Sequence, residues 1–354
     1  MCGAGVLLLL PALLQQGLLR TKDVYQLPAH HYYGLESIVL TLAFMALARI
    51  KNPEQLKQCK PGELGRIIGL DRVPEVRCLR DKLKLLTLQQ QAKTLNNLLI
   101  DQWYEENTDD AEFLYIDGHQ RIYYGQKANL PAKYISRQKL CLSATTEFWV
   151  NDAAGMPVMM VIGELSEKLQ TAIEQLIIPQ MMDAGLLEPI KEDHPPDQPQ
   201  CTFIFDREAY EPAFFQRLWQ AYRIAIITYL KNVKDNWEET SFKSFETKLL
   251  GQQINMLLCE QKTELGGHTF REIRRLGESG HQTAVITTHP TIETAVVAGR
   301  MFARWSQENF FRYLIADYDF DKMVEFGIQT LDLEKMVVNP EYRKLTHQLK
   351  KLRE

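Results

Sequence analysis

The stretch that most constrains the fold is residues 113–124, FLYIDGHQRIYY, in which two runs of apolar and aromatic residues flank Asp117 and Gly118. β-branched and aromatic residues favour strands, and Asp-Gly between two such runs is a strong hairpin signal. The pattern predicts antiparallel strands at 113–117 and 120–124. A buried strand that ends in a carboxylate needs a partner or a cation there. On this stretch alone, however, an ordinary turn residue explains Asp117 slightly better.

A second buried strand, CTFIFD, ends in Asp206 and is followed by Arg207. Around it, alternating and continuous apolar runs predict further strands, and apolar residues at helical spacing predict helices. The order is three strands, helix, strand, helix, strand, so the fold class is α/β with a mixed sheet. The predicted elements are strands at 147–150, 158–162, 201–206 and 224–228, and helices at 166–184, with Ser166 as N-cap and a kink at Pro179, and at 212–222.

The rest of the second half departs from this alternation. Residues 231–289 contain short strand-like pieces, which predict a separate, small β-rich insertion. Residues 291–316 then predict one long helix. Arg304, Glu308 and Arg312 are spaced by four residues along it, so they share one helix face. The predicted strands of the insertion are 246–250, 254–260, 270–276 and 282–287.

Residues 1–104 are predicted to be helical. The opening MCGAGVLLLL has an apolar core without a preceding positive charge, and Pro11 ends it well short of a membrane span. It therefore predicts the start of a buried helix, and no other stretch is long and apolar enough to cross a bilayer. The six cysteines are scattered without a CxxC pair, which indicates reduced, mostly buried thiols in a cytosolic protein.

Two short predicted helices at 61–70 and 74–83 are separated by a turn, and the second begins at Pro74. Two helices joined by a short turn, with basic residues on the second helix, are typical of a helix-turn-helix DNA-binding motif. A helical hairpin with a solvated basic face explains the pattern equally well. The basic residues of the second helix are Arg77, Arg80 and Lys82.

Charge is distributed unevenly along the 354 residues. Residues 1–100 carry 13 Lys and Arg against 7 Asp and Glu, whereas residues 101–339 carry 23 against 36. Residues 340–354 are basic again, with 5 against 2. Basic ends around an acidic middle suit a protein that grips a polyanion, although ordinary solvated surface is the simpler explanation of a charge balance this small.

Three carboxylates, Asp117, Asp206 and Glu308, meet at one sheet edge if the two strands are neighbours and the helix packs across them. Converging carboxylates repel unless a cation lies among them, and hard oxygen ligands suit Mg²⁺ or Mn²⁺. Two such ions, ~4 Å apart, can activate a water or a 3′-hydroxyl for phosphodiester chemistry. Each acid alone also has an ordinary explanation: a turn residue, a partner of Arg207, or a surface ladder with Arg304 and Arg312.

In combination, these stretches resemble the DDE transposases of bacterial insertion sequences, in the branch with an all-β insertion before the glutamate helix. The resemblance is carried by FLYIDGHQRIYYG, FIFDREAY and RWSQENFFRY. The branch follows its second Asp with Arg and then Tyr, which here are Arg207 and Tyr210. Its signature Tyr-x-x-Arg-x-x-x-Glu-x-x-x-x-x-x-Lys is matched at Arg304 and Glu308. Met301 replaces the Tyr and Ile315 replaces the Lys.

The resemblance implies an RNase H-like, five-stranded mixed sheet with flanking helices. It also implies that Asp117 bridges two Mg²⁺ or Mn²⁺ ions, with Asp206 on one and Glu308 on the other. The resemblance further implies that the protein nicks DNA at the element ends and transfers the freed strand into target DNA. The acting form would be a homodimer assembled on DNA. Its location would be the bacterial cytoplasm and nucleoid. The implied DNA-binding residues are Arg207, Tyr210, Arg304, Arg312, Arg77, Arg80 and Lys82, with Lys127, Lys133, Arg137 and Lys139 as weaker candidates.

The resulting domain organisation has five parts. A helical DNA-binding domain precedes a catalytic domain that the insertion divides, and a basic helix follows. The expected bounds are 1–104, 105–230, 231–289, 290–330 and 331–354. Two alternatives stay open: a transposase-derived DNA-binding protein without catalysis, and an RNase H-like nuclease that cuts without strand transfer.

Overall fold

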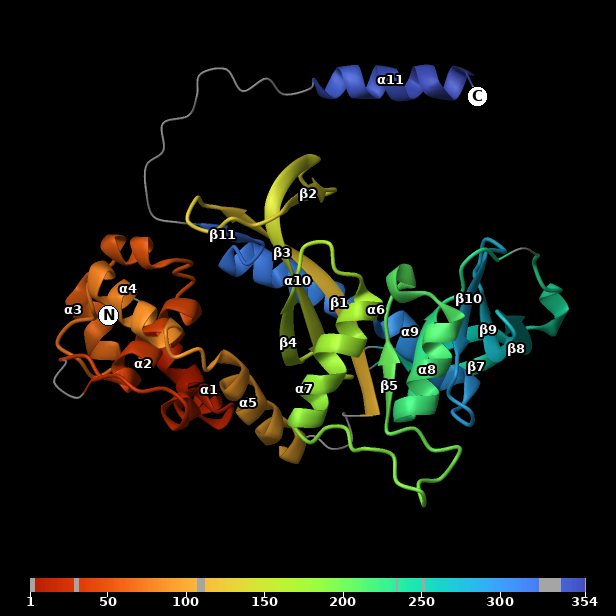
Figure 1. The fold of residues 1–354 in the computed structure, drawn as a ribbon, viewed down its shortest axis with the longest axis horizontal. Helices are drawn as coiled ribbons and strands as arrows, with labels where there is room; N and C mark the ends of the chain where they lie inside the picture. Colours follow the sequence, from red (N-terminus) through yellow and green to blue (C-terminus); the bar gives the residue numbers. More distant parts are fainter. Residues whose placement is uncertain are drawn as a thin grey trace.

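The computed structural model describes residues 4–28, 32–106, 112–233, 235–249, 252–324 and 339–353. Its centre is one 11-stranded mixed sheet in the order β2-β3-β1-β5-β6-β10-β9-β8-β7, with β4 on β3 and β11 on β1. Figure 1 shows the N-terminal helices grouped at one end of this sheet and β7–β10 at the other. The strands are β1 (Phe113–Tyr124), β2 (Ala132–Ile135), β3 (Leu140–Asn151), β4 (Pro157–Gly163), β5 (Cys201–Ile204), β6 (Ile224–Tyr229), β7 (Lys243–Leu249), β8 (Gln252–Leu265), β9 (His268–Leu276), β10 (Gln282–Thr287) and β11 (Lys322–Val324).

The hairpin expected within 113–124 is wrong, because β1 runs straight through Asp117 and Gly118. Its antiparallel partner is β3, which pairs with it from Tyr115 to Ile122 and sets Asp117 opposite Trp149. Glycine serves close packing here instead of a turn: a Cβ on Gly118 would lie 3.4 Å from the ring of Phe148. The Asp-Gly pair therefore sits in the middle of a long strand.

The β-rich segment is not separate from the main sheet. Its last strand, β10, pairs antiparallel with β6, with Val285 opposite Tyr229. Strand β6 is buried along nearly its whole length, as expected of a central strand with a neighbour on each side. The expectation of a five-stranded sheet with a detached insertion is corrected accordingly, because β7–β10 continue the same sheet.

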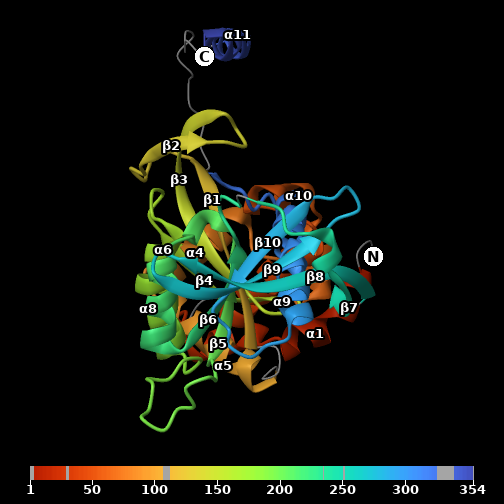
Figure 2. The ribbon, with the colours of Figure 1, turned by 90° about the vertical axis from the view of Figure 1, so that its right-hand side faces the viewer.

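Alternate residues of β1 pack on opposite faces of the sheet, as the period of two requires. Leu114 and Ile116 join the core beneath α6–α8, whereas Phe113 and Tyr115 join the core beneath α9. Figure 2 shows the sheet seen from its β7–β10 end, with α6 and α8 on one side and α9 and α10 on the other. The covering helices are α6 (Leu169–Ala172), α7 (Ile178–Asp183), α8 (Pro212–Tyr222), α9 (Thr294–Ala303) and α10 (Trp305–Tyr318).

The helix expected over 166–184 begins later and contains a wider turn. It starts at Leu169 with Lys168 before it and no side-chain cap, so Ser166 is not the N-cap. A π-helical turn at Ile173–Ile177 separates α6 from α7. Proline has no N–H and crowds the preceding turn, and the widened turn lies directly before Pro179. The kink takes the form of this π turn.

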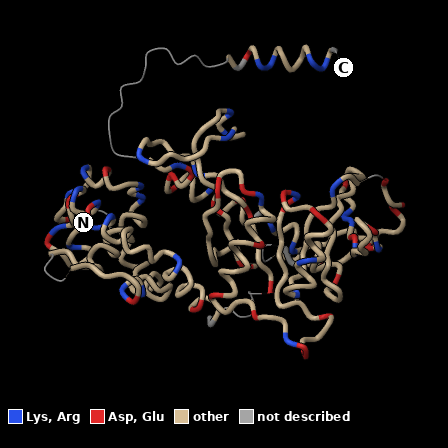
Figure 3. Tube along the Cα trace, in the orientation of Figure 1, with Lys and Arg blue, Asp and Glu red and all other residues tan. Residues whose placement is uncertain are grey.

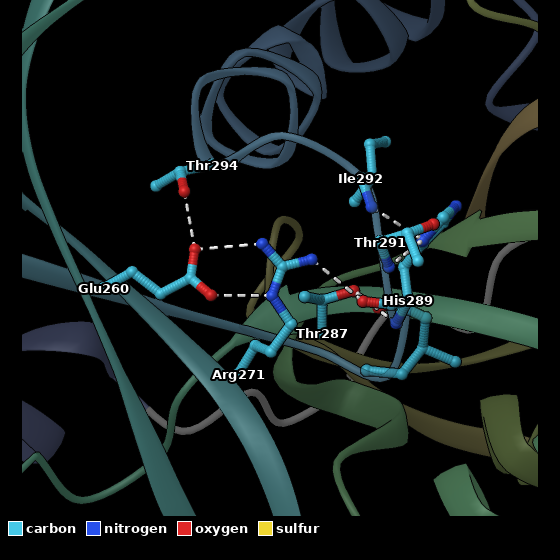
Figure 4. Close-up of polar contacts among 8 residues, drawn as sticks. Glu260, Arg271, Thr287, His289, Thr291, Ile292 and Thr294 are labelled. Atoms are coloured by element: carbon cyan, nitrogen blue, oxygen red, sulfur yellow. Dashed lines mark hydrogen bonds and ion pairs between the residues drawn. The ribbon is translucent and has the colours of Figure 1, made fainter. Parts of the chain in front are cut away.

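The single helix expected over 291–316 is two helices, α9 and α10, which meet at Arg304. An ion pair and several hydrogen bonds connect the N-terminal end of α9 to strands β8 and β9 (Figure 4). Arg271 donates to both carboxylate oxygens of Glu260, at 2.7 and 2.9 Å, and to the carbonyl oxygen of His289 at 3.0 Å. The hydroxyl of Thr294 also donates to Glu260, at 2.5 Å.

The N-terminal part is helical, as expected, and has its own small core around Ile38, Phe44 and Leu79. The expectation of a buried first helix is wrong: the opening is a short 3₁₀ helix and α1, and Leu8 is 85% exposed. Thiol burial was also overestimated, because only Cys201 is buried among the cysteines in the described ranges. The helices are α1 (Leu10–Gln15), α2 (Leu35–Leu47), α3 (Pro61–Ile67), α4 (Val76–Thr87) and α5 (Ala92–Glu106).

A basic helix, α11 (Pro340–Arg353), lies beyond the β2–β3 hairpin in Figure 1, and its Arg343 donates to the carbonyl oxygen of Lys139 in that hairpin at 3.3 Å. The acidic boundary loop expected at 105–110 lies mostly outside the described residues, since α5 continues to Glu106 and the next described residue is 112. None of the helices described here is long and apolar enough to cross a membrane.

Candidate active site

Two carboxylates from neighbouring parallel strands point to the same face of the sheet. Asp117 follows Tyr115 by two residues on β1, and Asp206 follows Ile204 by two at the end of β5. Both Tyr115 and Ile204 belong to the core beneath α9. Because β1 pairs in parallel with β5, both acids come to the side of the sheet that α9 and α10 cover. Asp206 also caps the short 3₁₀ helix Arg207–Ala209, accepting from the Arg207 N–H at 2.6 Å.

Arg304 stands among the three predicted acids. Its Nη2 donates to Glu308 Oε1 at 2.7 Å and lies 3.9 Å from Asp206 Oδ2. The Arg304 side chain is 12% exposed, whereas those of Asp206 and Glu308 are close to half exposed. Arg304 lies where α9 ends and α10 begins. The structure thus gathers the predicted acids around one guanidinium.

Asp117 has a pKa that is raised to about 6. Burial is the main cause, and the nearby Glu208 and Asp206 carboxylates act in the same direction. The charge of Arg304 and a hydrogen bond from the Gly118 N–H, at 2.9 Å, act in the opposite direction. A carboxyl group whose pKa is raised this far is typical of a functional site, although structural networks can produce the same shift.

Glu208 is a fourth acid that was missed by the sequence analysis. Burial and the charge of Asp206 raise the pKa of Glu208, and Lys133 lowers it. It lines a polar cavity of about 170 Å³ together with His119, Lys133, Arg137 and Glu167. Its position two residues after Asp206 was the available signal, since a 3₁₀ turn brings such neighbours together.

A larger cavity, of about 550 Å³, opens beside the acids. Asp117 and Glu308 line it together, with a basic residue from each side: Arg137 from the β2–β3 connection and Arg312 from α10. Ile315 lies in the same wall, at the position where the resembling branch carries Lys. A cleft with acids at its base and arginines at its rim can accept a phosphodiester, because arginine binds phosphate oxygens through a fixed fork of N–H groups.

The remaining residues predicted to bind DNA have varied surroundings. Arg207 lies over the Tyr229 ring, and Tyr210 packs edge-on against Phe215. On α4, Arg77 is exposed, Arg80 forms an ion pair with Glu54 at 2.6 Å, and Lys82 is 6% exposed. The two helices expected at 61–70 and 74–83 exist as α3 and α4. Their role in reading DNA stays a prediction.

The donor chemistry of the acids fits a hard divalent cation, since Asp117, Asp206 and Glu308 offer carboxylate oxygens only. Within the described ranges, however, no three His, Cys, Asp or Glu side chains come close enough together to hold a metal ion. The charge of Arg304 balances part of the cluster in this arrangement. Metal binding would therefore require Glu308 to leave Arg304.

Comparison with known proteins gives one match that identifies a family. No curated protein matches the chain. Among solved structures, a piggyBac transposase synaptic complex with hairpin DNA is similar at 8% identity and a TM-score of 0.43, over 82% of this chain and 59% of that one. A pre-cleavage Mos1 transpososome is similar at 11% identity and a TM-score of 0.22, over 59% and 64%.

The chain thus spans about three fifths of the length of these structures, and TM-scores this low add nothing to the argument. The match to a family model is much stronger evidence than these structural similarities. A model described as "Transposase protein" matches residues 1–353, which is nearly every residue of the chain. The chain therefore belongs to this family of transposases.

Proposed function

We propose that this chain is a DDE-type DNA transposase with an RNase H-like catalytic domain, in which Asp117, Asp206 and Glu308 hold Mg²⁺ or Mn²⁺, with two ions in the active complex. The observation that carries the proposal is the gathering of these acids around Arg304. The strand order β4-β3-β1-β5-β6, with β3 antiparallel and β5 parallel to β1, supports the RNase H-like assignment.

Bound metal would supply Lewis-acid stabilisation of the phosphodiester and lower the pKa of the attacking water. The chain itself orients the substrate: Arg312 and Arg137, at the rim of the 550 Å³ cavity, bind phosphate oxygens. Water attacks phosphorus at the element end and the 3′-oxygen leaves. The freed 3′-hydroxyl then attacks a target phosphodiester, so that one P–O bond forms and another breaks in each step.

Lysine and arginine also gather on α11 and at the β2–β3 hairpin, where Figure 3 shows clusters of blue. These groups suit an extended polyanion, and element ends and target DNA are the partners we propose. The protein would act as a homodimer assembled on two ends, in the bacterial cytoplasm and on the nucleoid. A DNA-binding domain at 1–104 belongs to the same proposal, with α3 and α4 reading the end sequence.

The test is Asp206→Asn, assayed for metal-dependent cleavage of a plasmid that carries the element ends. We expect cleavage to fall by about 10³-fold or more, because the variant loses a metal ligand, while DNA binding changes little. Asp197→Asn, which alters an exposed carboxylate on the linker before β5, is the matched control. Loss of DNA binding in Asp206→Asn would instead assign this residue a structural role.

One observation favours a second candidate, a transposase-derived DNA-binding protein without catalysis. Glu308 is 46% exposed and paired with Arg304 instead of lying against the two aspartates. The same plasmid assay separates the candidates. Absence of cleavage by the wild-type protein with Mg²⁺ or Mn²⁺, despite specific end binding, would establish the second one. Cleavage without joined products would indicate a nuclease that lacks strand transfer.

A further inference from the structure

Gln307, the residue before Glu308 on α10, is fully buried and bonded to both central strands. Its Nε2 donates to Asn151 Oδ1 at 2.8 Å, to the Tyr115 carbonyl at 3.1 Å and to the Trp149 carbonyl at 3.3 Å. Tyr115 belongs to β1, and the other two acceptors belong to β3. One amide group thus fastens α10 to the two strands that flank the site.

The position of these acceptors is specific to the site. Tyr115 precedes Asp117 by two residues, and Trp149 is the residue paired with Asp117 across the ladder. Asn151 is itself fully buried and held, since its Nδ2 donates to the Gly155 carbonyl at 3.1 Å in the β3–β4 turn. The bonds of Gln307 therefore fix α10 relative to Asp117 in particular.

An apolar residue would fill the same space at lower cost, because a buried amide stabilises the fold only when its polar atoms are bonded. The Oε1 of Gln307 is buried and lacks a hydrogen-bond partner among the described residues. The amide is thus a costly way to attach a helix. Hydrogen bonds are directional, so they fix the rotation of α10 about its own axis. Apolar contacts would allow the helix to shift along the sheet.

The start of α10 needs such fixing. The helix begins at the break at Arg304, where the Gln307 N–H donates to the Arg304 carbonyl at 3.0 Å. Glu308 then lies in the first turn, half exposed and bonded to the flexible end of Arg304. A small rotation of this turn would move the Glu308 carboxylate away from Asp117 and Asp206.

We propose that Gln307 is a positioning residue, whose bonds to β1 and β3 fix the first turn of α10 so that Glu308, once it leaves Arg304, can share divalent metal with Asp117 and Asp206. The inference rests on the proposed function. Gln307 touches neither substrate nor metal, and it acts through the orientation of Glu308.

The experiment compares Gln307→Met with Gln282→Met in the full chain. Gln282 is a matched control because it is also buried and bonded to backbone, donating to the Trp237 carbonyl at 2.7 Å, but it lies on β10. Mn²⁺ binding is measured by electron paramagnetic resonance, alongside thermal unfolding and the kcat and KM of end cleavage. We expect the Mn²⁺ Kd to rise about 10-fold in Gln307→Met, as when outer contacts of metal ligands are removed.

In that variant kcat should fall by about 10²-fold, the cost of a small misplacement of a reacting group, while KM for DNA changes little. Gln282→Met should lose comparable thermal stability but bind Mn²⁺ like wild type. Equal Mn²⁺ affinity in both variants and wild type would overturn the inference. If Gln307→Met does not fold, Gln307→Asn, one methylene shorter, gives the same contrast. Absence of Mn²⁺ binding and cleavage in wild type would instead overturn the proposed function.

Discussion

Two ionic clusters lie at opposite ends of α9, and they differ in charge balance. At the N-terminal end, Glu260 and Arg271 form a bidentate pair, one charge of each sign, with bonds of 2.7 and 2.9 Å. At the C-terminal end, among the described residues, the guanidinium of Arg304 is the one within ion-pair distance of Asp206 and Glu308, and its charge also lowers the pKa of Asp117. The first cluster pairs one charge of each sign. The second holds three carboxylates around one guanidinium, with Arg137 and Arg312 beside them in the cavity.

The difference indicates what each cluster does. A matched pair with well-directed bonds can fasten a helix to a sheet and needs no ligand. Surplus carboxylates repel one another, and their cost is lowered by protonation or by a cation. The pKa of Asp117 is raised first by burial and in smaller part by the Glu208 and Asp206 carboxylates. We therefore expect matched charge to mark structure in this protein and unmatched charge to mark a binding site.

The strongest test of this difference between the two clusters is to remove one carboxylate charge from each. We expect Glu308→Gln to lower metal-dependent cleavage by about 10³-fold or more, because it removes a proposed metal ligand. Glu260→Gln should keep cleavage within about 3-fold of wild type. Initial rates on a plasmid with element ends measure both variants. Equal losses would mean that both clusters serve only to hold α9 and α10.

The next largest effect concerns the two arginines. Arg271→Met should lower the free energy of unfolding by about 1–3 kcal/mol, since it leaves the Glu260 carboxylate unpaired, and Mg²⁺ should not restore it. Arg304→Met removes the only guanidinium that is within ion-pair distance of Asp206 or Glu308 among the described residues. In this variant Mg²⁺ should restore stability, because binding to the folded state adds about 2.7 kcal/mol at 100 times Kd.

Urea unfolding with and without Mg²⁺ measures this contrast. A matching gain in both arginine variants would show that Mg²⁺ acts on the protein in general. No gain in Arg304→Met would show that the acids do not bind a cation even after the guanidinium is gone.

The comparison also explains which features could be predicted from sequence. Strands with strong apolar runs were located well, such as β6 and β10, as were the acids that end or interrupt them. Apolar pattern and residue type are local properties, so the sequence carries them. Asp117 was placed on a turn because Asp-Gly favours hairpins, yet eight residues of β3 pair with β1 from Tyr115 to Ile122 and keep the chain extended.

Other features depend on partners far away in sequence. Gln307 looks like an ordinary helix residue until Tyr115 and Asn151 are known to lie beside it. The break at Arg304 likewise has no proline or glycine to announce it, and tertiary packing produces it. Pairing of β10 with β6 could not be predicted either, since neither strand contains a mark of its neighbour. The positions of the predicted acids were accessible to sequence analysis, but their shared guanidinium was not.

A smaller effect is expected from pH, and it separates the clusters again. The pKa of Asp117 is raised to about 6, so this group takes up a proton as pH falls through 6. Mn²⁺ affinity should therefore drop about 10-fold between pH 7 and pH 5. The pKa of Glu260 is lowered, first by its hydrogen bond from Arg271. Stability from that pair is fully present above the unfolded-state value of 4.5 and is lost only as pH falls through the lower folded-state pKa.

Asp117→Asn provides the control for this pH series. The raised pKa means that ionised Asp117 destabilises the fold above pH 6, so the variant should be more stable than wild type at pH 8. The gain should vanish below about pH 4, where Asp117 is protonated in both the folded and unfolded states. A drop in Mn²⁺ affinity at pH 5 that persists in a variant with normal folding but without Asp117 would assign the titration to another group.

The smallest expected effect extends the comparison to the N-terminal helices, where matched and unmatched charges lie on one helix. Arg80 pairs with Glu54 at 2.6 Å, whereas Arg77 is exposed three residues earlier on α4. If unmatched charge marks binding here too, Arg77→Ala should weaken binding to element-end DNA about 2- to 5-fold and reduce the slope of log affinity against log salt by about 1. Arg80→Ala should mainly lower thermal stability, because it leaves Glu54 without this partner.

Fluorescence anisotropy at several salt concentrations, with Lys93→Ala as an exposed control outside α4, distinguishes the two variants. A larger loss of affinity in Arg80→Ala than in Arg77→Ala would mean that the Glu54 pair opens when DNA binds, and that charge balance in the free protein does not identify the DNA-binding residues of this part of the chain.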